Sequence, residues 1–196
     1  MTEQLPQPTA QPPEAGKRSK PLGTLLEILE ILLLAAVFYI GIDAVVARLR
    51  VESISMLPTL RADDFILVNK LAYHGGTPQR GDIVVFRAPP DPSQDYVKRV
   101  IGLPGDVISV RNGMVYVNNE PLKEPYIAAE PAYTGTWVVP PGELFVLGDN
   151  RNQSSDSHSW GFVPMQSLVG RALVVYWPPN QAKLLTDSGI AVAAGP

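Results

Sequence analysis

The sequence predicts a mainly β protein: antiparallel sheets that form a curled or barrel-like domain, with one N-terminal transmembrane helix before it. Short runs rich in Val, Ile, Phe and Tyr recur from residue 61 onward and are too short for helices. The 196 residues include 20 prolines and 16 glycines, which suit a turn-rich β protein better than a helical bundle. A long apolar stretch precedes the first of these runs.

Residues 1–21 are expected to form a disordered tail. They are rich in proline and lack aromatic residues, so they cannot bury enough apolar surface to order themselves. The basic residues Lys17, Arg18 and Lys20 on this side face Arg48 and Arg50 on the other side of the apolar stretch. This balance only slightly favours a cytoplasmic N-terminus under the positive-inside rule.

Residues 22–47 are predicted to be a membrane anchor. The uninterrupted apolar part, residues 31–42, is 12 residues long, which is short of the about 20 that a spanning helix needs. Extension to residues 25–46 reaches that length and includes three acidic residues near the ends, where charge is tolerated. A buried amphipathic helix and a cleavable signal peptide, with small residues at Val45 and Ala47, remain alternatives.

The β-rich domain is expected over residues 48–180. The strand candidates are "DFILVNKLAY", "GDIVVFRAP", "YVKRVIGL", "DVISVRNGMVYVNN", "GELFVLGD" and "ALVVYWPP". The strongest is the hairpin "ISVRNGMVYV", because Asn112-Gly113 supplies the positive φ angles that a two-residue type I′ turn requires. Residues 181–196 carry no clear pattern and are predicted to be a C-terminal tail.

Composition excludes several classes of function. The net charge of −3 and the absence of a basic aromatic cluster argue against nucleic acid as a partner. The chain has no cysteine, so disulfides, thiolate zinc sites and cysteine nucleophiles are absent. It has only two histidines, His74 and His158, and no EF-hand loop. We therefore expect no cofactor and no metal, although residue counts leave carboxylate-bound magnesium or calcium open.

The stretch "SISMLPTL" places Ser55 in a stiff turn directly after the apolar region. Pro58 restricts its own φ and biases Leu57 to an extended conformation. A serine before an apolar residue and a proline is usually an ordinary turn residue. A stiff turn also holds a nucleophile at a fixed angle of attack, so Ser55 is a candidate nucleophile.

Two bases could activate such a serine. His158 with Asp156 would complete a Ser-His-Asp triad, although the polar loop "DSHSWG" favours local hydrogen bonding. Lys98 lies in the otherwise apolar run "YVKRVIGL", where alternation places it on the face opposite Val97 and Arg99. A lysine here normally extends outward to solvent. If it points inward, desolvation lowers its pKa and a neutral amine becomes available as a base.

The loop from Asp149 to Trp160 is unusually long and polar, with four serines. Such a composition is typical either of a solvated loop or of a self-bonded scaffold that supports a site. In the second interpretation the charged residues Asp149, Arg151 and Asp156 support the site.

Together these stretches resemble bacterial signal peptidase I, the membrane-anchored Ser/Lys endopeptidase that removes signal peptides from secreted preproteins. The matching blocks stand in the family's order, and the resemblance covers most of residues 25–177. The four blocks are "SMLPT" at 55–59, "RGDIVVF" at 80–86, "KRVIGLPGD" at 98–106 and "GDNRNQSSDSHSWG" at 148–161.

The resemblance implies a role for each matching residue. Ser55 would be the nucleophile, Lys98 the general base, and Ser154 the hydroxyl that orients the lysine amine. The oxyanion hole would use the backbone N–H of Ser55 and the hydroxyl of Ser53, while Asp156 and Arg99 would stabilise the site. His158 stands where the family usually has arginine, so its ion pair with Asp156 would be weaker and pH-sensitive.

The resemblance also implies a substrate and a location. Secreted preproteins would be cleaved after small residues at positions −1 and −3, and we expect Met56, Leu57 and Val97 to line the substrate pocket. The protein would be a single-pass protein of the plasma (inner) membrane, with its catalytic domain on the extracytoplasmic side. It would contact the lipid bilayer and the protein-export machinery. Alternatives are a LexA-like self-cleaving protein and a membrane-tethered β module that binds without catalysis.

Overall fold

The computed structural model describes residues 21–185 and 191–192. The predicted disordered tail therefore lies almost wholly outside the described residues, and so do residues 186–190 and 193–196. The chain divides into two units at Gly41 and Ile42, and each is described by itself.

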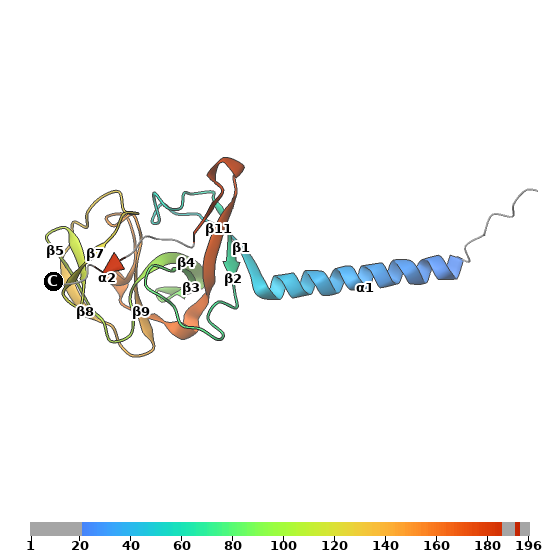
Figure 1. Cartoon of the computed structure of the whole chain (residues 1–196), viewed down its shortest axis with the longest axis horizontal. Coiled ribbons are helices and arrows are strands. Elements are labelled where there is room, and N and C mark those ends of the chain that lie inside the picture. Colours follow the sequence, from blue (N-terminus) through green and yellow to red (C-terminus); the bar gives the residue numbers. More distant parts are fainter. Residues whose placement is uncertain (1–20, 186–190, 193–196) are drawn as a thin grey trace, which may run out of the picture. The chain divides into compact units, whose positions relative to one another are not determined.

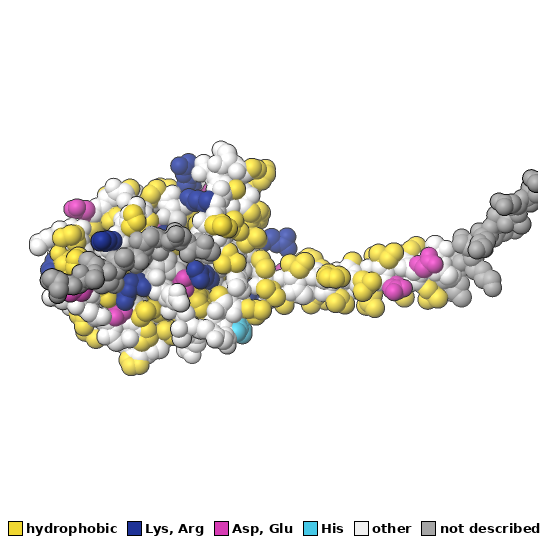
Figure 2. Space-filling model, viewed as in Figure 1, with side chains coloured by type: hydrophobic (Ala, Val, Ile, Leu, Met, Phe, Trp, Pro, Cys, Tyr) yellow, Lys and Arg dark blue, Asp and Glu magenta, His cyan; other side chains and the backbone are white. Residues whose placement is uncertain are grey.

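The N-terminal unit contains most of helix α1 (Pro21–Val45), and Figure 1 shows this helix as one continuous ribbon. Its Gly23–Val45 segment of 23 residues has a mean hydropathy of 2.4, and none of that window is buried. At 1.5 Å per residue the segment is about 35 Å long, enough to cross the hydrocarbon core of a bilayer. Figure 2 shows an almost continuous apolar surface along the helix. By length and composition it fits a membrane anchor.

The helix ends two residues before the predicted end of the anchor at residue 47. Val46 and Ala47 belong to strand β1 (Val46–Arg50), whose backbone pairs with Asn69 and Val68 of the next strand. Both residues are apolar enough to continue the helix, so hydropathy alone could not locate this boundary. Pairing with a distant strand decides it.

The second unit is mainly β and antiparallel, as predicted. The larger sheet has the strand order β1-β2-β11-β3-β4-β9-β10, with β12 paired to β11. Its remaining strands are β2 (Phe65–Asn69), β3 (Ile83–Ala88), β4 (Asp91–Gly102), β9 (Glu143–Leu147), β10 (Val163–Pro164), β11 (Leu168–Trp177) and β12 (Lys183–Leu184). The short helices are α2 (Ser157–Trp160), η1 (Met165–Ser167) and η2 (Pro179–Gln181).

The smaller sheet has five strands in the order β13-β7-β6-β5-β8. They are β5 (Val107–Arg111), β6 (Met114–Val117), β7 (Glu120–Lys123), β8 (Gly135–Val138) and β13 (Ala191–Val192). Figure 1 shows β5, β7 and β8 on the side of the domain where β9 lies. The predicted hairpin is confirmed: β5 pairs with β6, and the two turn residues Asn112 and Gly113 have φ of 51° and 75°.

The described part of the predicted C-terminal tail belongs to the sheets. Strand β12 pairs with Val174 and Val175 of β11, and β13 pairs with Leu122 and Lys123 of β7. Strands of two residues carry too little periodicity to be recognised in the sequence. Backbone pairing with β11 and β7 therefore places in the sheets a segment that has no clear pattern in the sequence.

Residues 97–102 of β4 and residues 144–147 of β9 are buried on both faces, which explains the apolar run of β9 and the burial of the charged residues in this half of β4. Val100 and Val146 pack in one buried cluster with Phe86, while Ile101 and Leu147 pack in another with residues of the smaller sheet. Side chains alternate along a strand, so neighbouring residues supply opposite clusters. The central strand that carries Lys98 is thus covered on both sides.

Candidate active site

Ser55 lies in a tight turn after β1 and is only 6% exposed. The turn is closed by hydrogen bonds from Leu57 N to Ile54 O (3.1 Å) and from Leu60 N to Met56 O (2.8 Å). The Met56 and Leu60 side chains are buried in the core beside β2 and β11. Apolar packing therefore holds the turn, and the serine is carried at a defined position.

The loop after β9 contacts the same turn and forms hydrogen bonds with it. Asn150 donates its backbone N–H to Ser55 O (3.0 Å) and its side-chain amide to Ile54 O (3.1 Å). Gly148 approaches so closely that a Cβ on it would lie 2.4 Å from Ser55 O and 2.2 Å from Ser154 Oγ. Only glycine fits at this contact, because no real Cβ comes within 3 Å of a backbone oxygen.

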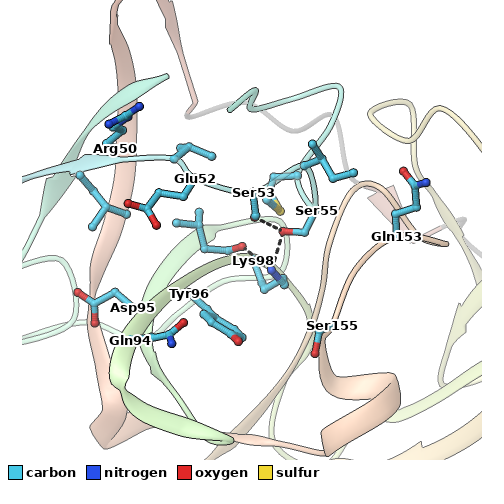
Figure 3. A pocket seen from close by; sticks show the side chains of 15 residues that line it. Arg50, Glu52, Ser53, Ser55, Gln94, Asp95, Tyr96, Lys98, Gln153 and Ser155 are labelled. Atoms are coloured by element: carbon cyan, nitrogen blue, oxygen red, sulfur yellow. Dashed lines mark hydrogen bonds between the residues drawn. The ribbon is translucent and has the colours of Figure 1, made fainter. Parts of the chain in front are cut away.

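Lys98 points inward. It lies on β4 opposite Val84 of β3 and is 4% exposed. Its Nζ donates to Ser55 Oγ at 2.7 Å and to Val97 O at 3.1 Å, and lies 5.3 Å from the centre of the Tyr96 ring. Figure 3 shows the amine directed at the serine hydroxyl. The structure brings together the two residues that the sequence proposes as nucleophile and base.

The environment of the amine suits a base. Burial lowers the pKa of Lys98 from its ordinary 10.5 to about 8, and the carboxylates of Asp156 and Asp149 oppose part of this shift. Desolvation disfavours the ammonium form and therefore dominates. About half of the amine is neutral at pH 8, so it can accept the serine proton under mild conditions.

Arg99, the residue after Lys98, is almost fully buried. Its guanidinium binds the Asp149 carboxylate at two points, Nε to Oδ1 (2.8 Å) and Nη2 to Oδ2 (2.6 Å). It also donates to Gly81 O (3.1 Å) and stacks on the Tyr126 ring at 4.0 Å. These contacts fit the expected support of the site by Arg99 and Asp149.

Asp156 organises the far end of the loop. One carboxylate oxygen accepts the Gly148 backbone N–H (2.9 Å), and the other lies 2.6 Å from Nδ1 of His158. The His158 ring stacks on Tyr133, with centroids 4.0 Å apart. The described contacts of Ser55 Oγ are to Lys98 and Ser53, so the geometry does not form the Ser-His-Asp triad.

Arg151 supports the loop through a partner that the sequence did not indicate. It donates to Gly148 O (3.1 Å) and makes two hydrogen bonds with Glu124 (2.5 and 2.6 Å). Glu124 lies 27 residues away, in a segment without a motif, and Tyr126 nearby is equally unmarked. The polar composition of the loop indicated a scaffold, but not these partners.

The two remaining serines differ in their contacts. Ser53 Oγ lies 3.1 Å from Ser55 Oγ, and its place in an oxyanion hole stays a prediction. The predicted hydrogen bond from Ser154 to the Lys98 amine is not formed: Ser154 Oγ is buried, packs against Gly148 and has no hydrogen-bond partner among the described residues. The amine is held instead by Ser55 and Val97, so an orienting role for Ser154 stays a prediction.

A groove of about 700 Å³ leads to the Ser55–Lys98 pair. One wall is formed by residues 49–56 and the other by residues 94–98 of β4, with Gln153 and Ser155 near the serine. Met56 and Val97 line it as expected. Leu57 does not line it: the groove wall ends at Met56, and the Leu57 N–H closes the turn onto Ile54 O.

Both walls have a free backbone edge. β1 is the terminal strand of its sheet, and β9 pairs with β4 only from Arg99 to Gly102, which leaves residues 94–98 open on that side. An extended peptide placed between these edges could hydrogen bond to both. No group of three metal-ligating side chains occurs within the described residues.

The fold and the site define a class. A mainly β domain with a buried lysine amine on a serine hydroxyl, beneath a groove for an extended peptide, is typical of serine hydrolases that use lysine as the base.

Comparisons with known proteins identify the family. The model of the family "Signal peptidase, peptidase S26" matches residues 25–177. A probable signal peptidase I-2 from Synechocystis sp. is 45% identical over 195 residues, covering 95% of this chain and 87% of that protein. A signal peptidase I from Leptolyngbya laminosa is 42% identical over 193 residues, covering 92% and 95%. A crystal structure of a signal peptidase I from Enterococcus faecalis covers 49% of this chain and 97% of its own, with 36% identity and a TM-score of 0.46.

The chain belongs to the signal peptidase family, peptidase S26. Membership of this peptidase family makes it a serine endopeptidase. The matched region begins at residue 25 and so includes most of α1, as expected for a membrane-anchored enzyme.

Proposed function

We propose that this chain cleaves N-terminal signal peptides from secreted preproteins, with Ser55 as nucleophile and Lys98 as general base. The observation that carries the assignment of these residues is the 2.7 Å contact between Lys98 Nζ and Ser55 Oγ, buried at the end of the groove. The two relatives above are a probable signal peptidase I-2 and a signal peptidase I, and this chain covers 87% and 95% of their length, which supports the substrate class. Neither a LexA-like self-cleaving protein nor a binding module without catalysis is favoured by these findings.

The proposed reaction begins with the neutral amine. Lys98 accepts the Ser55 hydroxyl proton as Oγ attacks the scissile carbonyl carbon, and a tetrahedral oxyanion forms. The intermediate collapses, the C–N bond breaks, and Lys98 returns the proton to the departing amine of the mature protein. A water molecule then gives a proton to Lys98 and attacks the acyl carbon. The ester C–O bond breaks, Lys98 returns the proton to Ser55 Oγ, and the signal peptide leaves with a free carboxylate.

The oxyanion would be stabilised by the Ser55 backbone N–H and by the Ser53 hydroxyl. Donors held beside the nucleophile stabilise the charge that develops on the carbonyl oxygen. The 3.1 Å separation of the two serine oxygens supports this assignment, because it places the Ser53 hydroxyl at the reacting centre. Four charged residues would act indirectly, because they hold the loop and the strand that carry the reacting groups: Asp149, Arg151, Asp156 and Arg99.

The substrate would bind as an added strand in the groove. The free edges of residues 94–98 and of the β1 side supply backbone hydrogen bonds. Residues −1 and −3 of an extended peptide point to the same face, where Met56 and Val97 leave room for small side chains.

We assign the helical segment at residues 22–45 as a single-pass anchor in the plasma (inner) membrane and the sheets that begin with β1 at Val46 and include β12 and β13 as the protease domain. The N-terminus would be cytoplasmic and the domain extracytoplasmic, in contact with the bilayer and with the export machinery that delivers preproteins. The exposed apolar helix and its length support the anchor. Tethering raises the effective concentration of membrane-bound substrate around the site.

A preprotein cleavage assay with the full chain in detergent or lipid tests the proposal. Wild type should produce the mature protein, and Ser55→Ala and Lys98→Ala should each lose at least about 1,000-fold in rate, as residues that act as one unit do. Far-UV circular dichroism of both variants verifies folding. Wild-type rates in both variants would refute the dyad, whereas an inert wild type would favour a binding module.

A further inference from the structure

Glu52 is an acidic residue in the wall of the substrate groove that the mechanism does not use. It lies three residues before Ser55, and its side chain is exposed. Figure 3 shows its carboxylate on the groove side, away from the serine. Among the described residues it makes no ion pair: the neighbouring Arg50 hydrogen bonds to Asp63, at 2.7 and 3.0 Å, and the attraction of Arg50 to Glu52 is weaker than its attraction to Asp63.

The facing wall does not neutralise Glu52. Asp95 is the acidic residue there, and in the antiparallel register it has the basic residue Arg87 of β3 as its cross-strand neighbour. Lys98 is buried and must be neutral when it acts as a base. Among the described charged residues of this part of the groove, Glu52 therefore stands apart. In the part of the chain that the structure describes, it has no ion pair, and it has no cross-strand neighbour of opposite charge.

The position of Glu52 corresponds to a particular substrate residue. Until water hydrolyses the acyl-enzyme, the signal peptide stays attached to Ser55. The groove formed by residues 49–56 and 94–98 can bind this part of the substrate. The carbonyl of residue −1 lies at Ser55. At about 3.3 Å per residue, an extended substrate reaches residue −4 about 10 Å along the groove from Ser55. We align that residue with Glu52, which lines the same groove three residues before Ser55.

The alternation of side chains along an extended substrate agrees with the alignment of residue −4 with Glu52. Side chains −1 and −3 point to one face of an extended substrate, and −2 and −4 point to the other. On the enzyme, Ser53 and Ser55 contact each other through their hydroxyls. Glu52 is the residue before Ser53, so it does not belong to this alternating pair. A charged side chain at −4 is thus free of the small pockets and close to the carboxylate.

We propose that Glu52 is a specificity-determining residue that favours a basic side chain, and disfavours an acidic one, at position −4 of the signal peptide. This inference rests on the proposed function and names a property of the same site. An exposed pair acts through water, so the preference is modest and decreases as salt increases. It affects KM more than kcat, because position −4 does not take part in the bond change.

The test measures kcat/KM on three preproteins that differ only at −4, carrying Lys, Gln or Glu. Wild type should cleave the Lys substrate about 3-fold faster than the Gln substrate, and the Glu substrate about 3-fold slower, at low ionic strength. The Lys/Glu ratio of about 10 should fall to about 2 or less in Glu52→Gln and below 1 in Glu52→Lys. Asp95→Asn is the matched control and should retain more than half of the wild-type ratio.

Each ratio is measured within one variant, so differences in folding or active fraction cancel. A wild-type ratio near 1, or the same ratio in wild type and Glu52→Lys, would overturn the role of Glu52 while cleavage of the Gln substrate still supported the proposed function. If wild type cleaves none of the three preproteins, both proposals fail.

Discussion

Arg99 and Asp149 form a two-point ion pair with side chains only 2% and 0% exposed. Arg99 follows Lys98 on β4, and Asp149 lies between Gly148 and Asn150, the two residues that contact the Ser55 turn. The pair thus joins the strand of the proposed base to the loop that holds the proposed nucleophile. Lys98 and Ser55, which lie 2.7 Å apart, are thus carried by two segments that this ion pair connects.

Asp149→Asn should lower the free energy of unfolding by about 3–5 kcal/mol, because it leaves the Arg99 charge buried without its partner. Chemical denaturation of the full chain in detergent measures this. Asp63→Asn makes the same change in the exposed Arg50–Asp63 pair and should have little effect, since exposed pairs contribute little. Equal losses in the two variants would show that the Arg99–Asp149 pair has no special structural role.

The pH dependence of cleavage should follow the neutral amine of Lys98. Because burial lowers the pKa of Lys98 to about 8, kcat/KM should rise about tenfold per pH unit below 8 and level off above it. Asp156→Asn removes a negative charge that raises this pKa, so the midpoint should move to lower pH. A midpoint near 10.5, or a shift upward in Asp156→Asn, would contradict the assignment of Lys98 as the base.

Gly148→Ala should damage both stability and activity. The added Cβ would lie 2.4 Å from the Ser55 carbonyl oxygen and 2.2 Å from Ser154 Oγ, so backbone must move. We expect a loss of about 1–3 kcal/mol in the free energy of unfolding and about 100-fold in kcat, since the nucleophile turn is displaced. Gly75→Ala is the control, because a Cβ there meets nothing within 4 Å. Full activity in Gly148→Ala would show that the contact is not needed.

Ser53→Ala should lower kcat about 10-fold or more and leave KM nearly unchanged. A hydroxyl that acts only on the developing oxyanion stabilises the transition state and not the bound substrate. Steady-state kinetics on one preprotein separates the two parameters. An unchanged kcat would remove Ser53 from the oxyanion hole, and a raised KM alone would make it a binding residue.

Local patterns in the sequence predicted the elements whose formation depends on neighbouring residues. The Asn112-Gly113 turn is an example, because its positive φ angles are a property of two adjacent residues. The apolar helix and the short β runs follow in the same way from composition and period. The quoted motif blocks also identified Ser55 and Lys98 as a pair, although 43 residues separate them.

The tertiary structure decided what depends on residues far apart in the chain. Alternation placed Lys98 opposite Val97 and Arg99, but only the assembled sheets show that residues 97–102 of β4 are covered on both faces and that the amine is desolvated. The Glu124–Arg151 pair and the close approach of Gly148 to Ser55 had no local pattern. Apolar periodicity in the sequence indicates which faces of a segment are buried. Long-range packing decides which other segments cover those faces and how far apart the side chains lie.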